Sequence, residues 1–113
     1  MNINTQNVLR DLVEFNDSIN NLEKRVSFLT WDISEDHVFL NKNNILKVLE
    51  KFQDGYLTDN EVERWANLIE CREGIFFLEE IKDIIYELAN PDLTFKLQNE
   101  RATYLIKMLK KSG

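Results

Sequence analysis

Apolar residues in this chain recur at steps of three and four, and this spacing constrains the fold more than any other feature. Near the start of the chain the steps alternate between four and three, as they do along one face of an α-helix. Asn16, Asp17 and Ser18 interrupt this pattern with side chains that compete for backbone hydrogen bonds. We therefore expect two helices that meet near Asp17, with one long helix over 5–29 as the alternative. The residues of this N-terminal stripe are Val8, Leu12, Phe15, Ile19, Leu22, Val26 and Leu29.

The rest of the chain carries start and stop signals for further helices. Asn41 is suited to cap one helix, and Gly55 is suited to end it in the left-handed conformation. Thr58 and Glu61 have the spacing of a capping box at the start of the next helix. Pro91 ends a later helix, because the residue before a proline disfavours the helical region. The predicted helices cover 42–53, 59–71, 76–89 and 99–111.

No pair of strands is indicated, and the segment 30–40 is expected to be a connecting loop, with at most a short extended piece. The chain has 113 residues, which is the size of one domain. Trp65 falls on an apolar helix face and is expected in the core, as are Leu78 and Ile81. The fold class predicted is all-α, a compact single-domain bundle of five to six helices over 1–113.

Charge is distributed unevenly along the chain. The formal net charge is −6, but 31–92 alone carry −9 and 93–113 carry +4. An acidic block of this kind repels phosphate backbones and attracts basic proteins. We therefore expect a basic protein as partner, and no direct contact with nucleic acid.

Few residues in the sequence are arranged for chemistry. The chain has one histidine, His37, and one cysteine, Cys71, and neither belongs to a catalytic or zinc-binding motif. The segment 52–61 resembles half of a calcium loop, but Phe52 stands where the loop needs an oxygen ligand. Glu80-Ile81-Lys82 matches a fragment of some nuclease sites, but it lies inside a strong helical period. We expect no enzyme activity, no cofactor and no metal.

The sequence also predicts the cellular location of the protein. Residues 1–16 have neither the basic region nor the continuous apolar region of a secretory signal. The longest apolar run, Ile75 to Leu78, is far shorter than the ~20 residues that cross a bilayer. Together with an unpaired cysteine, these features predict a soluble, cytoplasmic protein that does not contact membranes.

Acidic and aromatic residues at helical spacing form the candidate binding surface. On the helix from Asp59, acidic residues lie on the polar face. On the next helix acids recur at steps of four, and like charges at that spacing cost ~0.2–0.5 kcal/mol per pair. The simpler interpretation is that these acidic residues only keep the protein soluble. The more specific interpretation is that they form a docking face for a basic partner. The candidate residues are Trp31, Asp32, Glu35, Asp36, Glu63, Glu70, Glu79, Asp83, Tyr86 and Glu87.

Four local pieces of the sequence together resemble a known group of proteins. They are Trp31-Asp32, Gly55-Tyr56-Leu57-Thr58, Glu61 followed by Trp65-Ala66-Asn67, and Glu87-Leu88-Ala89-Asn90-Pro91. The set resembles a family of small, acidic, helical bacterial proteins. In size, charge and composition the chain is also similar to immunity proteins of bacterial toxin systems, including contact-dependent growth inhibition. Where members of such a family commonly show a glycine and an acidic run, this chain has residues 71–75.

The resemblance implies a function without chemistry. An immunity protein binds its cognate toxin and neutralises it, and many such toxins are nucleases with basic clefts. Charge complementarity would then speed encounter, and a few desolvated aromatic anchors would supply affinity. The rival hypothesis is a structural or regulatory adaptor that self-associates through the N-terminal stripe, so a homodimer is a second, less favoured expectation.

Overall fold

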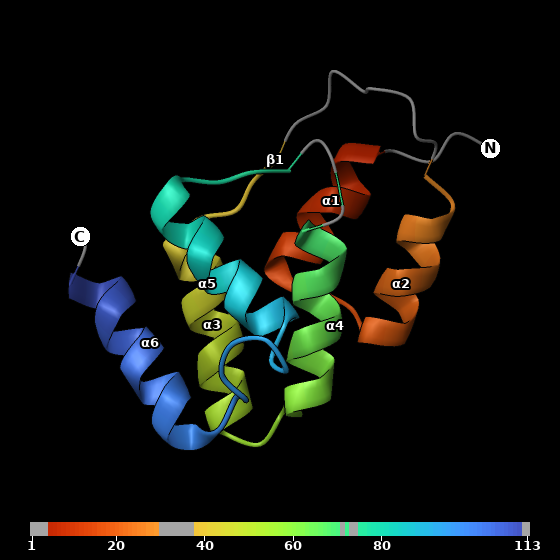
Figure 1. The fold of residues 1–113 in the computed structure, drawn as a ribbon. Coiled ribbons are helices and arrows are strands. Elements are labelled where there is room, and N and C mark those ends of the chain that lie inside the picture. The colour runs from red at the N-terminus through yellow and green to blue at the C-terminus, as the bar shows by residue number, and fades with distance from the viewer. Residues whose placement is uncertain (1–4, 30–37, 71, 73–74, 112–113) are drawn as a thin grey trace.

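The computed structural model describes residues 5–29, 38–70, 72 and 75–111. Within these ranges the chain is a compact bundle of six helices with one very small sheet (Figure 1). This architecture confirms the all-α prediction. The helices are α1 (Thr5–Glu14), α2 (Ile19–Ser27), α3 (Lys42–Gln53), α4 (Asp59–Glu70), α5 (Glu79–Ala89) and α6 (Asn99–Lys111), and the strands are β1 (Val38–Phe39) and β2 (Ile75–Phe76).

The helical conformation is interrupted between α1 and α2, as the polar residues at 16–18 predicted. Phe15 has a φ of 53°, in the left-handed region that usually favours glycine. The Asn16 amide donates to the Asp11 carbonyl at 2.9 Å and the Phe15 amide to the Leu12 carbonyl at 3.1 Å. These two bonds close the end of α1 as a Schellman motif. Phe15 adopts this conformation while its ring is buried in the core.

The predicted caps of α3 and α4 are confirmed. At α3 the Asn41 side chain accepts a bond from the Asn44 amide, and the Asn44 side chain accepts one from the Asn41 amide. At α4 the Glu61 amide donates to the Thr58 hydroxyl at 3.1 Å, and the Thr58 amide donates to the Glu61 carboxylate at 2.9 Å. These side chains accept hydrogen bonds from backbone amides at the helix starts, which have no carbonyl partner within the helix.

The start of α5 was predicted wrongly. The helix begins at Glu79, because Ile75 and Phe76 are extended and pair in parallel with Val38 and Phe39. The prediction failed because two-residue strands are too short to show an alternating pattern. Leu78 precedes the first turn and is 64% exposed, so its assignment to the core was also wrong.

One hydrophobic core draws on all six helices. Helix α4 packs most extensively against α5 and also contacts α1, α2 and α3, while α6 packs against α3 (Figure 1). Trp65 on α4 lies at the centre and is fully buried, as predicted. Its indole Nε1 donates to the Leu12 carbonyl at 2.6 Å, and its ring stacks on Phe15 with centroids 6.1 Å apart.

The N-terminal stripe is part of this core. Val8, Leu12, Phe15, Ile19 and Leu22 are each at most 6% exposed. Val26 is only partly buried against this core, and the rival hypothesis of self-association through the stripe stays a prediction. Among the described residues, no helix is long and apolar enough to cross a bilayer.

Replacing Trp65 by phenylalanine is expected to destabilise the fold by about 2–4 kcal/mol, because it leaves a cavity and removes the donor to Leu12. Urea unfolding followed by circular dichroism measures this loss. The exposed Tyr56, changed to phenylalanine, is the control and should alter stability by less than about 0.5 kcal/mol. Equal, small changes in the two variants would contradict the central role of Trp65.

Candidate functional site

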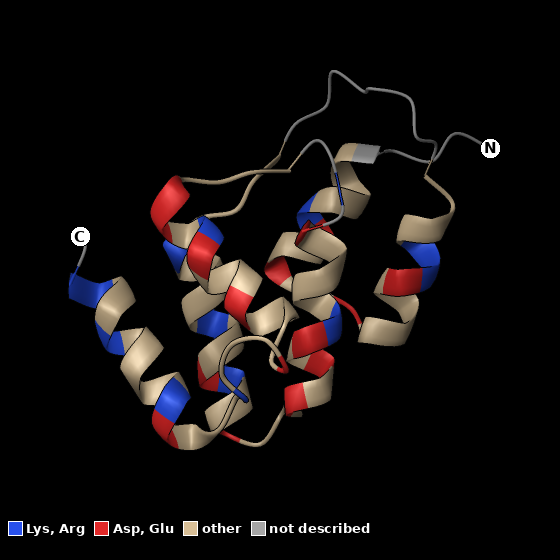
Figure 2. Ribbon diagram, viewed as in Figure 1, with Lys and Arg blue, Asp and Glu red and all other residues tan. Residues whose placement is uncertain are grey.

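The structure places six of the candidate residues on two neighbouring helices (Figure 2). Glu63 and Glu70 belong to α4. Glu79, Asp83 and Tyr86 are exposed along one side of α5, at the spacing of successive turns, and Glu87 follows them. The other four candidates, Trp31, Asp32, Glu35 and Asp36, lie outside the described residues, as do His37 and Cys71.

One asparagine connects the two helices at this surface. The Asn90 side-chain amide donates to the Tyr86 carbonyl at 2.9 Å and to the Glu70 carboxylate at 3.5 Å. It therefore brings the exposed end of α4 next to the exposed side of α5. We call the exposed set Glu70, Glu79, Asp83 and Tyr86 the acidic face. Within the described parts of the chain, its carboxylates form no ion pair.

Glu87 is not part of the acidic face, because it is paired within the chain, and its expected role in partner binding stays a prediction. The Arg101 guanidinium donates to both of its carboxylate oxygens, at 2.8 and 2.5 Å. The Glu87 side chain is only 12% exposed. Its charge is therefore neutralised within the chain by a residue of α6, and it contributes little to the field that a partner would meet.

Arg101 is held from several sides. Its guanidinium lies over the Phe95 ring at 3.9 Å and over the Tyr104 ring at 4.6 Å. The hydrogen bonds to Glu87 raise the pKa of Arg101 above its ordinary value. This arrangement combines a forked ion pair with cation–π contacts, and it ties the end of α5 to the start of α6.

Glu63 lies apart from the acidic face. It lines a shallow depression of about 170 Å³ with Asp59, Asp92 and Lys96. Asp59 and Glu63 are one helical turn apart, so their spacing could have indicated Asp59 from the sequence. Asp92 and Lys96 come from the segment between α5 and α6, and only the fold brings them here.

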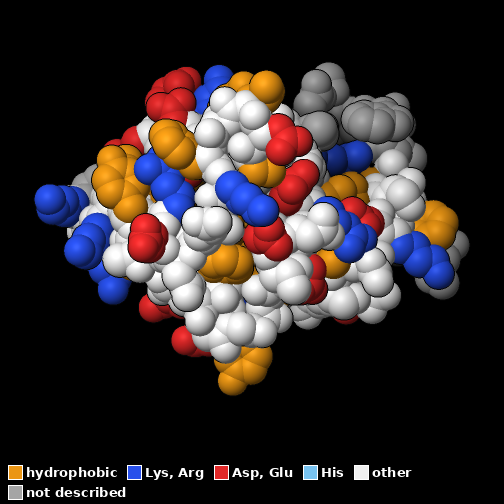
Figure 3. Space-filling model, turned by 60° about the horizontal axis from the view of Figure 1, so that its bottom comes forward, with side chains coloured by type: hydrophobic (Ala, Val, Ile, Leu, Met, Phe, Trp, Pro, Cys, Tyr) orange, Lys and Arg blue, Asp and Glu red, His pale blue; other side chains and the backbone are white. Residues whose placement is uncertain are grey.

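Acidic side chains do not dominate every part of the surface. On the face drawn in Figure 3, acidic and basic side chains lie interspersed. In Figure 2, basic residues are prominent near the end of α6. The ion pair between Arg101 and Glu87 places part of the positive charge of 93–113 against the acidic block. The carboxylates of the acidic face are among several described carboxylates that form no ion pair with a described base.

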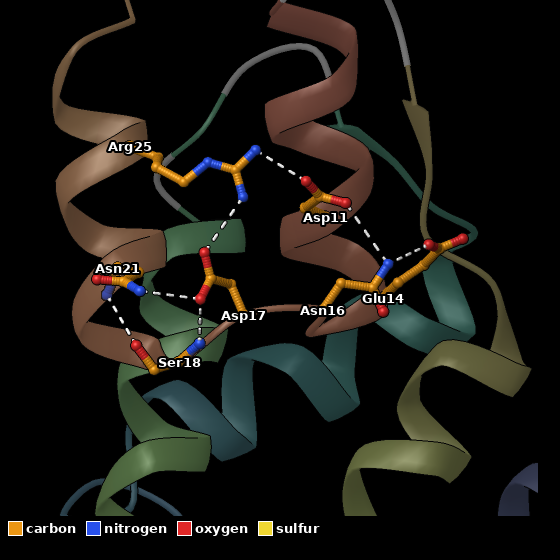
Figure 4. A network of polar contacts seen from close by, with 7 residues as sticks. All are labelled: Asp11, Glu14, Asn16, Asp17, Ser18, Asn21 and Arg25. Carbon is orange, nitrogen blue, oxygen red and sulfur yellow. Dashed lines mark hydrogen bonds and ion pairs between the residues drawn. The ribbon is translucent and has the colours of Figure 1, made fainter.

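A polar network joins α1 to α2 (Figure 4). Arg25 contacts Asp11 at 2.8 Å and Asp17 at 3.5 Å. Asp17 also accepts bonds from the Asn21 side chain and the Ser18 amide, and these bonds lower its pKa below the ordinary value. The network holds the two helices at the break between them.

A second ion pair joins α2 to α4. Arg64 donates to the Glu23 carboxylate through Nε at 3.0 Å and also through its terminal nitrogen. The pair lies beside a groove of about 390 Å³ that is lined by apolar residues of both helices, including Val26 and Leu68. The hydrogen bond from Arg64 lowers the pKa of Glu23.

The described residues were also compared with the arrangements that hold metal ions and ligands. Among them, no group of three His, Cys, Asp or Glu side chains is placed to hold a metal ion. Their buried polar side-chain atoms all have hydrogen-bond partners, so none is left to be satisfied by a ligand. What the acidic face can do is attract and bind positively charged groups.

Comparison with models of known protein families, with curated protein sequences and with solved structures finds no match. The resemblance to immunity proteins therefore stays a prediction that rests on the size, charge and composition of the chain.

The pair between Glu87 and Arg101 is expected to show strong coupling. Glu87→Gln or Arg101→Gln alone should destabilise the fold by about 1–3 kcal/mol, because each leaves a half-buried charge without its partner. The double variant should lose clearly less than the sum of the two. Chemical unfolding of the four proteins measures this coupling, and simply additive losses would show that the pair has no net interaction.

Acid should weaken the contact between α2 and α4. The folded-state pKa of Glu23 lies below the ordinary value of 4.5. Its stabilising contribution is therefore complete well above pH 4.5, and it disappears as the pH falls through the lower folded pKa. Arg64→Gln should lower the melting temperature more at pH 7 than at pH 3, while exposed Arg10→Gln serves as the control. An equal loss at both pH values would contradict this linkage.

Proposed function

We propose that this protein is a non-enzymatic inhibitor that binds a basic bacterial toxin domain, as immunity proteins do. The observation that carries the proposal is the acidic face, whose exposed carboxylates on α4 and α5 have no basic partner within the described chain. The uneven charge along the sequence and the similarity of the chain in size, charge and composition to such proteins support it.

Electrostatics supports this type of partner. Like charges at successive turns of α5 reduce the stability of the free helix, so a sequence selected for stability alone would place bases between them. Lys82 is exposed on the same helix, but it forms no ion pair among the residues described. A basic partner relieves this repulsion on binding, which makes the face better suited to a complex than to the isolated chain.

The mechanism follows from what the face offers. Its carboxylates steer a basic domain toward α4 and α5 and raise the association rate. Tyr86 lies among them and is 46% exposed, so its ring can become buried on binding while its hydroxyl keeps a hydrogen bond. A nuclease partner would lose access to phosphate because the bound carboxylates occupy or shield its basic cleft. No bond is made or broken by the inhibitor itself.

The test uses a triple charge reversal, Glu70→Lys, Glu79→Lys and Asp83→Lys. Affinity purification from the native host first identifies a basic domain, with the domain encoded directly upstream as the first candidate. Titration of the purified domain should then show at least about 100-fold weaker binding by the triple variant, mainly through slower association. Inhibition of toxicity in cells that express both proteins should be lost in parallel.

A matched triple variant controls for net charge. Glu14, Glu50 and Asp54 are exposed acids on α1, on α3 and at the end of α3. Their reversal to lysine changes the net charge by the same amount and should leave binding within a few-fold of wild type. If both triple variants bind equally well, or equally poorly, the acidic face is not the binding site. If no basic domain is bound by the wild type at moderate salt, the proposed function is wrong.

A further inference from the structure

The side of α6 that faces away from the core carries exposed aromatic and basic side chains. Helix α6 packs against α3 at the edge of the bundle (Figure 1). Its buried residues are Ala102, Leu105 and Leu109. Tyr104 is 51% exposed and Met108, one turn further along the helix, is 42% exposed. Large apolar side chains that gather on an exposed helix face mark an interaction site.

Two aromatic rings are held in fixed positions near the start of α6. The Arg101 guanidinium lies over the Phe95 ring and over the Tyr104 ring while it donates to the Glu87 carboxylate. It covers only part of each ring, since Phe95 is 56% exposed and Tyr104 is 51% exposed. Rings that are fixed before a ligand arrives bind it at a smaller cost in conformational entropy.

The two rings border an open depression of about 430 Å³. The exposed Gln98 amide donates and accepts hydrogen bonds, and the exposed Glu100 carboxylate accepts them. Nucleobases present donors and acceptors of this kind along their edges, and their faces stack on aromatic rings. The depression therefore has the groups that one base requires. Its lining residues are Phe95, Lys96, Gln98, Glu100, Arg101 and Tyr104.

Lysines continue this surface along the helix. Lys107 and Lys111 are exposed and follow Tyr104 by three and seven positions, so the three side chains share one side of α6. Among the described residues, neither of these lysines nor Lys96 forms an ion pair. Separate positive charges beside aromatic rings are the arrangement that follows the backbone of a single strand. We call Phe95, Lys96, Tyr104, Lys107 and Lys111 the α6 surface.

We propose that the α6 surface binds single-stranded nucleic acid. One base occupies the depression and stacks on the exposed parts of the Phe95 and Tyr104 rings. Lys96 contacts the phosphate of this nucleotide, and Lys107 and Lys111 contact phosphates further along the strand. The depression is open, so it encloses little of a free nucleotide, and the contacts along α6 supply the rest of the affinity.

Other anionic partners fit this surface less well. A lipid bilayer would bury the Gln98 amide and the Glu100 carboxylate without hydrogen-bond partners, which is costly. An acidic peptide can pair with the lysines, but its carboxylates provide no flat face for the two rings. Only a base combines a face that stacks with an edge that forms hydrogen bonds.

The net charge of the chain, −6, does not oppose binding at this place. Exposed charges are screened over about 8 Å at physiological salt, so nearby lysines act on a strand more strongly than distant acids. The expectation of no contact with nucleic acid came from the acids of 31–92, whereas the α6 surface belongs to 93–113, which carry +4. It shares no residue with the acidic face, so this inference does not depend on the proposed function.

The experiment measures binding of labelled single strands to the full chain by fluorescence anisotropy. RNA and DNA strands of about 12 nucleotides and mixed sequence are used at about 100 mM salt. At least one should bind with a Kd of about 1–100 µM. A duplex of the same sequence should bind at least about fivefold more weakly, because its bases are already stacked and paired. Absence of binding to both strands, or equal binding of the duplex, overturns the proposal.

Two variants test the two parts of the surface. Phe95→Leu with Tyr104→Leu should weaken binding at least about tenfold, because leucine keeps an apolar contact but cannot stack. Lys96→Gln with Lys107→Gln and Lys111→Gln should lower the slope of log Kd against log salt by about 2, since each phosphate contact to a single strand contributes about 0.7. The lysine variant tests the proposal even if the aromatic variant fails to fold. An unchanged slope overturns it.

Matched controls change the same kinds of residue elsewhere. Phe28 is 60% exposed and Phe39 is 71% exposed, and neither lines the depression. Phe28→Leu with Phe39→Leu should bind as the wild type does. The exposed bases Arg10, Lys24 and Lys47, all changed to glutamine, match the charge of the lysine variant and should leave the slope unchanged. Equal effects of control and test variants would show that the α6 surface is not the binding site.

Competitors identify the source of the bound anion. Adenosine monophosphate, polyglutamate and vesicles of phosphatidylserine are each added to the complex with the labelled strand. An unlabelled strand should displace the labelled one at far lower concentration than any of the three. If polyglutamate or the vesicles compete equally well, charge alone is recognised and the proposal is wrong. If the mononucleotide does so, the ligand is a free nucleotide and not a strand.

Discussion

The fold depends on one buried side chain that joins both halves of the bundle. Trp65 reaches from α4 to the end of α1, where its indole donates to the Leu12 carbonyl and its ring stacks on Phe15. The carbonyl at the end of a helix needs a partner, and a buried indole needs an acceptor. The Leu12 carbonyl already accepts the Phe15 amide, and the indole uses its second lone pair, so this bond fixes the end of α1 against α4. Phe15 adopts a left-handed conformation at this point, and its burial offsets the steric cost.

Helix positions followed from the sequence wherever the signal was local. The apolar period and the caps at Asn41 and Thr58 indicated α3 and α4 closely, and the period alone indicated α6. The apolar period gave wrong predictions at Phe76 and Leu78. A two-residue parallel strand pair depends on residues far away in the chain, and it is too short to show an alternating pattern. The use of Phe15 where glycine is usual was equally invisible, since it depends on the contact with Trp65.

The candidate site was predictable only in part, for a related reason. Helical spacing placed Glu79, Asp83 and Tyr86 on one side of α5, which the structure shows to be exposed. The same spacing assigned Glu87 to that side as well, and Arg101, fourteen positions later in the chain, neutralises it. Charge counted along a sequence overestimates the charge that a partner meets, because tertiary ion pairs remove some of it.

The charge that is not neutralised within the chain differs between the start and the end of α5. At its start, Glu79 and Asp83 are exposed near Lys82, and Leu78 and Ile81 line a groove. At its end, Tyr86 lies next to Glu70 with Asn90 fixing the distance, and no base among the described residues pairs with this carboxylate.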